Sequence, residues 1–161
     1  MAQTVQNGIQ IGNKAPDFTL PDQNGTPTHL ADFIGKSAIV LYFYPKDNSA
    51  GCTLEACTFR DSYEAFQQAG ATVVGVSIDS TESHQGFAQK HRLPFILLSD
   101  QGSTVHKLYG ISNFLGVIRG RETFVIDKDG IIRHRFASQV NMTRHVTDAL
   151  RVLQSLPQAH P

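Results

Sequence analysis

The sequence predicts an α/β fold in which helices cover both faces of a central mixed β-sheet of about five strands. Two patterns carry this prediction. Apolar runs rich in β-branched and aromatic residues, typical of strands buried on both faces, alternate with segments whose apolar residues repeat at helical spacing. Such alternation indicates parallel strands joined by helices. Near the end of the chain, two strand patterns follow one another across a tight turn, which adds an antiparallel edge.

The strands are predicted from apolar runs that end at turn-forming residues. The segment QNGT at residues 23–26 indicates the tip of an N-terminal hairpin, because Asn-Gly accepts a positive φ. The run SAIVLYFYP, stopped by a proline, predicts a strand that is buried on both faces. In chain order, the sheet strands are expected over residues 37–45, 71–79, 95–100, 121–127 and 131–136. An Asp-Gly turn joins the last two.

Helices are predicted where apolar residues recur at helical spacing. They are expected over residues 53–70, 81–92, 102–110 and 141–156. Gly70 ends the first, and the last is amphipathic, with an apolar face made by Val146, Ala149, Leu150 and Leu153. This order of elements is that of the thioredoxin fold with an N-terminal hairpin extension. No linker divides it, so a single domain over residues 1–161 is expected.

Size, composition and charge exclude several classes of function. A chain of 161 residues with 40% hydrophobic and 17% charged residues fits a globular domain with a real core. Fourteen basic residues balance fourteen acidic ones, so no net charge favours binding to nucleic acid or to an anionic membrane. The basic cluster RHRF at residues 133–136 is expected to be the solvated face of a strand. The longest apolar run is too short to cross a bilayer, and the first residues match neither a signal nor a transit peptide, so a cytoplasmic location is expected.

The chain has two cysteines, Cys52 and Cys57, which lie five positions apart at the start of a predicted helix. Cys52 follows a buried strand and a short loop that ends in Ala50 and Gly51, two small residues that allow a close approach to the backbone. The first backbone N–H groups of a helix have no partner within it, and the helix dipole is positive there. Both effects favour the thiolate form of a cysteine. Cys52 is therefore predicted to be a nucleophile.

Cys57 lies about one and a half turns after Cys52 on the same predicted helix. Helix geometry places their Cα atoms roughly 8–9 Å apart, whereas a disulfide needs them within about 7 Å. The two thiols can therefore join only if the start of the helix unwinds. The alternative for Cys57 is that it is an inert core residue.

Neither a metal site nor a cofactor is predicted. The cysteine spacing does not complete the pattern of a zinc site, and the seven histidines are scattered along the chain. His84 and His91 lie seven positions apart on one face of the helix expected over residues 81–92, and both are expected to be solvated.

A thiolate with a second thiol within reach suits the reduction of a peroxide. Attack on the peroxide yields a sulfenic acid, a nearby thiol condenses with it to a disulfide, and an external dithiol protein reduces the disulfide. Such a site also needs a hydroxyl to hold the peroxide oxygens and a cation to stabilise the developing charge. Ser49, three positions before Cys52, can supply the hydroxyl. The candidate cations, which the residues alone do not rank, are Lys46, Arg60 and Arg121.

The segment YPKDNSAGCTLEACTFRD resembles the active-site segment of the peroxiredoxins, above all of the peroxiredoxin Q or bacterioferritin comigratory protein subfamily. The stretches GNKAPDFTLPDQNG, VVGVSIDSTESHQGFAQKHRLPFILLSD and RETFVIDKDGIIRHRF extend the similarity over most of the chain. The subfamily pattern Pro-x3-Thr-x2-Cys, with a resolving cysteine five residues later, maps onto Pro45, Ser49, Cys52 and Cys57. The resemblance implies that Cys52 is the peroxidatic cysteine, that Cys57 resolves it and that Pro45 shields Cys52.

The same resemblance selects the cation, because the family's arginine precedes a strand of the form Arg-x-(Ser/Thr)-Phe-(Leu/Val)-Ile-Asp. Here that arginine is Arg121, and Arg119 ranks below it. The resemblance also implies a monomeric thiol peroxidase that reduces hydrogen peroxide and organic hydroperoxides with electrons from thioredoxin or a similar dithiol reductant. Two residues depart from the family pattern. Ser49 replaces a threonine and loses the methyl that restricts the rotamer, and Ala50 replaces a proline, so the loop is expected to unwind more easily.

Two other functions stay open at this point. A thiol–disulfide oxidoreductase of the thioredoxin class would share the fold and the helix-start cysteine, but the chain lacks the C-x-x-C motif. A non-catalytic, chaperone-like module could use the apolar loop SNFLGVIRG, residues 112–120, as a binding surface. The preferred interpretation is that Phe114, Leu115 and Val117 pack beside a site or a partner subunit.

Overall fold

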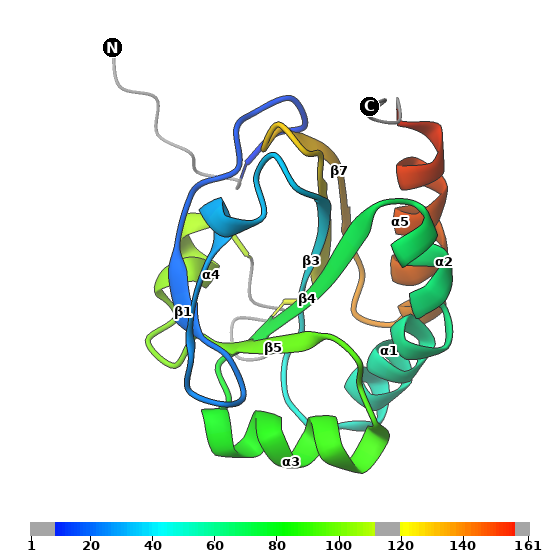
Figure 1. The fold of residues 1–161 in the computed structure, drawn as a ribbon. Helices are drawn as coiled ribbons and strands as arrows, with labels where there is room; N and C mark the ends of the chain where they lie inside the picture. Colours follow the sequence, from blue (N-terminus) through cyan, green and yellow to red (C-terminus); the bar gives the residue numbers. More distant parts are fainter. Residues whose placement is uncertain (1–8, 112–119, 157–161) are drawn as a thin grey trace.

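The computed structural model describes residues 9–111 and 120–156, and a mixed sheet lies at its centre (Figure 1). Within these residues, five strands pair in the order β5-β4-β3-β6-β7. The parallel strands are β3 (Ala38–Phe43), β4 (Ala71–Ser77) and β5 (Ile96–Ser99). The antiparallel strands at the other edge are β6 (Glu122–Ile126) and β7 (Ile132–Ala137). The predicted mixed sheet with an antiparallel edge is confirmed.

The central strand β3 explains why the sequence shows an unbroken apolar run. All of its side chains are buried, because it has a strand on each side and a packed layer on each face. Successive side chains point to opposite faces, so Val40 and Tyr42 join one hydrophobic core, whereas Ile39, Leu41 and Phe43 join the other.

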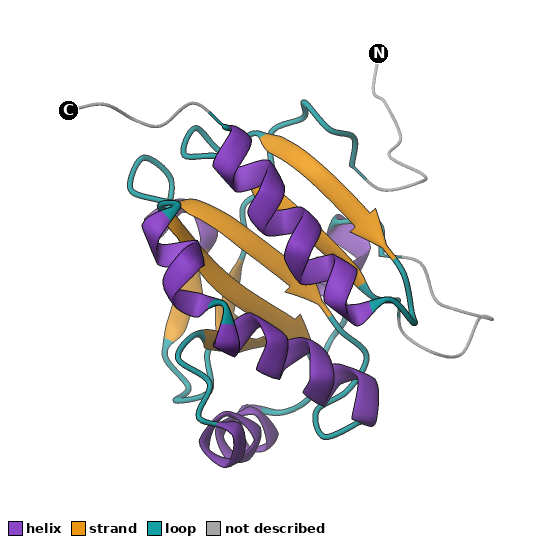
Figure 2. Cartoon of the chain, turned by 90° about the vertical axis from the view of Figure 1, so that its right-hand side faces the viewer, coloured by secondary structure: helices purple, strands orange, loops and turns teal. Residues whose placement is uncertain are grey.

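Helices and a hairpin form the two covering layers. One face carries the helices α1 (Ala50–Asp61), α2 (Tyr63–Gln68) and α5 (Met142–Ser155), which lie in front of the strands in Figure 2. The other face is covered by α4 (Thr104–Leu108), the hairpin of β1 (Thr19–Pro21) and β2 (Pro27–His29), and the short helix η1 (Leu30–Asp32). The remaining helix, α3 (Thr81–His91), packs beside β5 at the end of the sheet. None of the helices in the described part of the chain is long and apolar enough to cross a membrane.

The helix expected over residues 53–70 differs from the prediction at its start and in its middle. It begins at Ala50, because the Ser49 side chain caps it. It is interrupted at Ser62, whose N–H is shared between the carbonyls of Thr58 and Phe59 at 3.1 and 3.2 Å, and α2 continues from there. The second piece ends before Gly70, which has a φ of +78° and acts as the predicted stop.

The tip of the N-terminal hairpin forms at residues 23–26, as the Asn-Gly sequence predicted. β1 and β2 pair antiparallel, and Gly25 takes the left-handed backbone conformation with a φ of +80°. The Asp22 carboxylate also holds the turn, since its Oδ1 accepts the N–H groups of Asn24 and Thr26 at 2.8 and 3.0 Å.

Two predictions of solvated polar groups need correction. His84 is fully buried, with its two ring nitrogens 2.7 Å from an oxygen of Asp47 and 2.9 Å from the Leu98 carbonyl. These partners come from segments distant in sequence, and only with them is the burial of an imidazole tolerable. The cluster at residues 133–136 is solvated only in part, because Arg135 forms an ion pair with the buried carboxylate of Glu122.

Candidate active site

The predicted reacting residues lie at the carboxyl end of β3, where a loop leads into α1. Ser49 is the N-cap of α1. Its Oγ accepts the N–H of Cys52 at 3.4 Å, and its hydroxyl donates to the Lys46 carbonyl at 3.0 Å. The single hydroxyl proton is thus used, and one lone pair remains to accept a hydrogen bond from a substrate O–H group.

The two cysteines differ in exposure but share one helix. Cys52 is 1% exposed and belongs to the hydrophobic core, whereas Cys57 is half-buried. Both thiols are free, and α1 is continuous between them. In such an unbroken helix, residues at this spacing are too far apart to form a disulfide.

Arg121 reaches Cys52 from a distant part of the sequence. It directly precedes β6, and β6 pairs antiparallel with β3 so that Glu122 lies opposite Phe43, the last residue of β3. The guanidinium is therefore brought beside the end of β3, and there it interacts with Cys52 and donates from Nη1 to Glu55 Oε1 at 2.7 Å. Burial opposes its charge, yet the pKa of Arg121 is raised, because Glu55 and Cys52 both favour the cation.

Glu55 is a functional candidate that the sequence reasoning missed. It lies between the two cysteines, and its side chain is fully buried. Burial raises its pKa to about 7, although the Arg121 guanidinium opposes this shift. Its Oε2 has no hydrogen-bond partner among the described residues. Its spacing from Cys52 is a signal that could have identified Glu55, because a residue three positions after Cys52 lies on the same side of a helix.

His145 on α5 closes this buried polar region. Its Nδ1 lies 2.7 Å from the Thr123 hydroxyl and 3.7 Å from Glu55 Oε2, and its Nε2 lies 2.8 Å from the Ser138 carbonyl. Burial lowers the pKa of His145 to about 4, so the ring is neutral near pH 7. Because the Ser138 carbonyl can only accept, Nε2 carries the proton and Nδ1 accepts from Thr123.

Replacing Glu55 by glutamine should flatten the pH dependence of stability between about pH 4.5 and pH 7. The folded protein raises the pKa of Glu55 from its ordinary 4.5 to about 7, so the folded state binds this proton more tightly than the unfolded chain does. Its stabilising contribution is complete below the ordinary pKa and is lost as the pH rises through the folded value. The contribution is on the order of 3 kcal/mol, which urea unfolding at a series of pH values measures.

Glu122→Gln is the matched control for this experiment, because Glu122 is also a buried carboxylate paired with an arginine, Arg135. The flattening should occur in the Glu55 variant alone. Equal flattening in both variants, or none in the Glu55 variant, would show that another group titrates in this range.

The other two candidate cations point elsewhere. The side chain of Lys46 is exposed to solvent. Arg60 pairs with Asp61 at 3.0 Å and donates to the His91 carbonyl at 2.8 Å, and its charge interacts with Cys57. Arg121 is thus the cation that the structure brings beside Cys52. Arg119, the residue ranked below it, lies outside the described residues, as does most of the apolar loop at residues 112–120.

The absence of a side chain at Gly51 leaves space for two neighbouring side chains. A Cβ at this position would overlap Cε of Met142 on α5 and would lie 3.1 Å from Nη2 of Arg121. The absent side chain therefore lets Arg121 and α5 approach the first turn of α1. Pro45 is half-buried at the start of the same loop, and its shielding of Cys52 stays a prediction.

One cluster of possible metal ligands occurs in the described ranges, and it consists of Asp47, Asp79 and His84, whose ligand atoms lie within 4.8 Å of one another. Hydrogen bonds already engage these atoms. Asp47 accepts from Ser83 and faces His84, and Asp79 accepts the Asp47 N–H and the Ser77 hydroxyl. The group therefore has the character of a closed hydrogen-bond network.

Comparison with known proteins places this chain in a family. The chain matches the AhpC/TSA family over residues 11–135. It is 51% identical to the chloroplastic peroxiredoxin Q of Sedum lineare over 92% of this chain and 80% of that protein. It is 47% identical to the chloroplastic peroxiredoxin Q of Triticum aestivum over 92% of this chain and 68% of that protein.

Solved structures agree with the observed fold. The crystal structure of peroxidoxin BcpB from Mycobacterium tuberculosis matches with a TM-score of 0.87 and 37% identity, over 93% of this chain and 99% of that one. A cysteine-to-serine variant of peroxiredoxin Q from Xylella fastidiosa matches with a TM-score of 0.84 and 32% identity, over 91% and 96% of the two chains. The predicted thioredoxin-like architecture is therefore confirmed.

The predicted cytoplasmic location is wrong. The relatives from Sedum, Triticum, Populus and Arabidopsis are all named chloroplastic. The physical reason for the error is that a compartment is specified by targeting segments that are separate from the folded domain. The prediction is based on the first residues, which match no signal or transit peptide, and the absence of such a pattern does not specify a compartment.

Proposed function

This chain belongs to the AhpC/TSA family and to its peroxiredoxin Q branch, and on this premise we propose that Cys52 is the residue that peroxide oxidises. The protein is a thiol-dependent peroxidase, and peroxides are its substrates. The observation that carries the residue assignment is the position of Cys52. It is the third residue of α1, beside the Arg121 guanidinium and bonded through its N–H to Ser49.

In the first step, the Cys52 thiolate attacks an oxygen of the hydroperoxide and the O–O bond breaks. That oxygen stays on sulfur, which becomes a sulfenic acid, and the other oxygen leaves as an alcohol or water after taking a proton. Arg121 stabilises the thiolate and the negative charge on the leaving oxygen. Ser49 orients the substrate by accepting its O–H group with the remaining lone pair.

In the second step, the Cys57 thiol attacks the Cys52 sulfenic acid, a disulfide forms and water leaves. The thiols share one unbroken helix, so this step requires the start of α1 to unwind. Glu55 lies between the two cysteines, and unwinding therefore also withdraws its carboxylate from Arg121. The replacement of the family's proline by Ala50 is expected to ease this opening.

Thiol–disulfide exchange with a dithiol protein of the thioredoxin type then restores both thiols. Hydrogen peroxide and organic hydroperoxides are the proposed substrates. Support comes from the bacterioferritin comigratory protein of Xanthomonas campestris, a relative of known structure to which alkyl peroxide reduction activity is ascribed.

We further propose a plastid location, which the names of the plant relatives support, and a monomeric state. The alternative function, a thiol–disulfide oxidoreductase of the thioredoxin class, would require the same fold. The family to which the chain belongs supports the peroxidase instead.

Peptide mapping by mass spectrometry tests the role of Cys57. After one equivalent of peroxide, the reduced protein should contain a disulfide between Cys52 and Cys57 of the same chain. In Cys57→Ser, the oxidised Cys52 should instead remain as a sulfenic acid that dimedone labels. A stable sulfenic acid in the unaltered protein, or a disulfide between two chains, would reject Cys57 as the resolving residue.

A further inference from the structure

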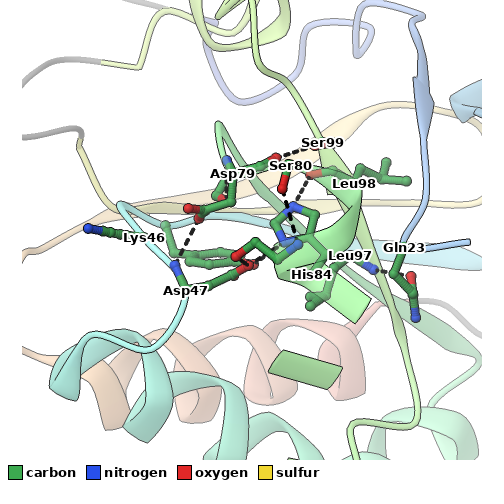
Figure 3. Close-up of polar contacts among 12 residues, drawn as sticks. Gln23, Lys46, Asp47, Asp79, Ser80, His84, Leu97, Leu98 and Ser99 are labelled. Carbon is green, nitrogen blue, oxygen red and sulfur yellow. Dashed lines mark hydrogen bonds and ion pairs between the residues drawn. The ribbon is translucent and has the colours of Figure 1, made fainter. Parts of the chain in front are cut away.

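A partly buried polar network holds the loop that precedes Cys52 against α3 and the end of β4 (Figure 3). We call it the loop anchor, and it consists of Tyr44, Asp47, Asp79, Ser83 and His84. Asp47 is 3% exposed and His84 is fully buried, although both are strongly polar. So many polar groups are costly to bury, and their mutual hydrogen bonds offset that cost.

The Asp47 carboxylate is held on both oxygens. Oδ1 accepts the Tyr44 hydroxyl at 2.6 Å, and Oδ2 accepts the Ser83 hydroxyl at 2.8 Å and faces His84 Nδ1 at 2.7 Å. The other ring nitrogen of His84 faces the Leu98 carbonyl at 2.9 Å, so the imidazole ties the loop to the end of β5. With these contacts, the side chain of Asp47 has a single defined position.

The backbone of the same residue is held by Asp79. The Asp47 N–H donates to Asp79 Oδ2 at 2.8 Å, and the Ser77 hydroxyl donates to the same oxygen at 2.6 Å. This N–H and the Lys46 carbonyl belong to one peptide unit. On its opposite side, that carbonyl accepts the Ser49 hydroxyl at 3.0 Å.

A continuous hydrogen-bond chain therefore joins the Asp79 carboxylate to the N–H of Cys52 through one peptide unit and one hydroxyl. Charge on Asp79 polarises the peptide, which makes the Lys46 carbonyl a stronger acceptor for Ser49. The fixed direction of this carbonyl also selects one rotamer of Ser49. A threonine is stiff at χ1 because of its methyl group, whereas a serine has three staggered positions to choose from.

We propose that Asp79 is a positioning residue for the peroxidase reaction, and that it acts through the Lys46–Asp47 peptide unit to hold the Ser49 hydroxyl in the orientation that accepts the substrate O–H. In this chain, the anchored carbonyl takes the place of the threonine methyl of the family pattern. The inference rests on the proposed role of Ser49 in binding peroxide. Its consequence is that Asp79 matters for the peroxide step only while residue 49 is a serine.

A double-mutant cycle tests this dependence. Asp79→Ala should lower the second-order rate constant of Cys52 oxidation, measured by stopped flow, about tenfold, because the hydroxyl is misplaced. In a Ser49→Ala background, the same change should have almost no further effect. When the reductant is kept scarce enough to limit turnover, turnover at saturating peroxide should stay near that of the unaltered protein. An equal loss in both backgrounds would mean that Asp79 merely supports the fold.

Conservative substitutions at residues 79 and 49 should preserve most of the rate of Cys52 oxidation. Asp79→Asn keeps an oxygen that can accept the Asp47 N–H, so most of the rate should be retained. Ser49→Thr restores the methyl, and with it Asp79→Ala should cost less than about threefold. If threonine gives no protection, the proposal is overturned. Should Asp79→Ala fail to fold, Ser77→Ala removes the hydroxyl that holds Asp79 and should show the same dependence on residue 49 with a smaller loss.

Asp100→Ala is the control, because Asp100, like Asp79, is a carboxylate that follows a sheet strand and accepts backbone N–H groups, and it lies outside the loop anchor. It should leave the oxidation rate of Cys52 unchanged. The cycle also separates two failures. If Cys52 is oxidised as fast in Ser49→Ala as in the unaltered protein, the proposed role of Ser49 is wrong. If Ser49→Ala is slow but Asp79→Ala is as fast as the unaltered protein, only the positioning role of Asp79 is wrong.

Discussion

Replacing Cys52 by serine should abolish peroxide consumption, with a loss of roughly 10⁴-fold or more. A serine hydroxyl is not ionised near neutral pH, and neither the start of α1 nor Arg121 can turn it into a nucleophile comparable to a thiolate. The measurement is peroxide consumption with a thioredoxin system as the electron source.

Cys57→Ser is the control for this experiment, since it removes a thiol from the same helix. It should still consume one equivalent of peroxide per chain and then stop, because Cys52 can be oxidised but has no partner with which to form a disulfide. Undiminished turnover by Cys52→Ser would sink the assignment of the reacting residue, whatever the behaviour of the Cys57 variant.

Replacing Arg121 by alanine should slow the oxidation of Cys52 by roughly 10²–10³-fold, the usual effect of removing a preorganised group that stabilises developing charge. The guanidinium touches both Cys52 and Glu55, so this change also leaves a buried carboxylate without its partner. The experiment should therefore be repeated in a Glu55→Gln background, where the stability is less affected and the loss of rate should remain. Stopped-flow oxidation by hydrogen peroxide measures it.

Arg60 offers a control, because it is a second arginine near the cysteines. It lies on α1, and its side chain pairs with Asp61 and not with Cys52 or Glu55. Arg60→Ala should oxidise at nearly the rate of the unaltered protein. Arg121→Lys keeps the charge but cannot hold two partners with a planar fork, and most of the loss should persist. Equal rates for the alanine variants of Arg60 and Arg121 would contradict the assignment.

The sheet and the position of Cys52 at a helix start could be predicted from the sequence because both have local signals. An apolar run identifies β3 wherever it packs, and a cysteine that follows a strand and a small-residue loop marks a helix start. The break at Ser62 has no such signal, since the pattern of apolar residues continues across it. Arg121 could be chosen only through the resemblance, because its approach to Cys52 depends on how β6 aligns with β3.

The buried polar residues were missed for a related reason. Glu55 and His84 look like solvated helix positions, because a helical pattern assigns polar side chains to the surface. Each is buried only because partners arrive from other elements, Arg121 for Glu55 and Asp47 for His84. Pairs of this kind become visible once the topology is known, and one of them, Glu55 with Arg121, lies beside Cys52.

Glu55 connects the chemistry of the site to the opening of α1. In the reduced protein its buried carboxyl holds the first turns of α1 to Arg121, and unwinding exposes it to water. Opening should therefore become easier as the pH rises toward 7, where the buried group ionises at increasing cost. In the proposed mechanism, the residue that holds Arg121 during the first step is therefore released in the second.

Hydrogen exchange followed by mass spectrometry tests this opening most directly. After one equivalent of peroxide, the amides of α1 between Cys52 and Cys57 should lose their protection, while those of β3 keep theirs. Reduction by a dithiol should restore the protection. If the chain forms the disulfide between Cys52 and Cys57 and α1 stays fully protected, the claim that the helix must unwind is contradicted.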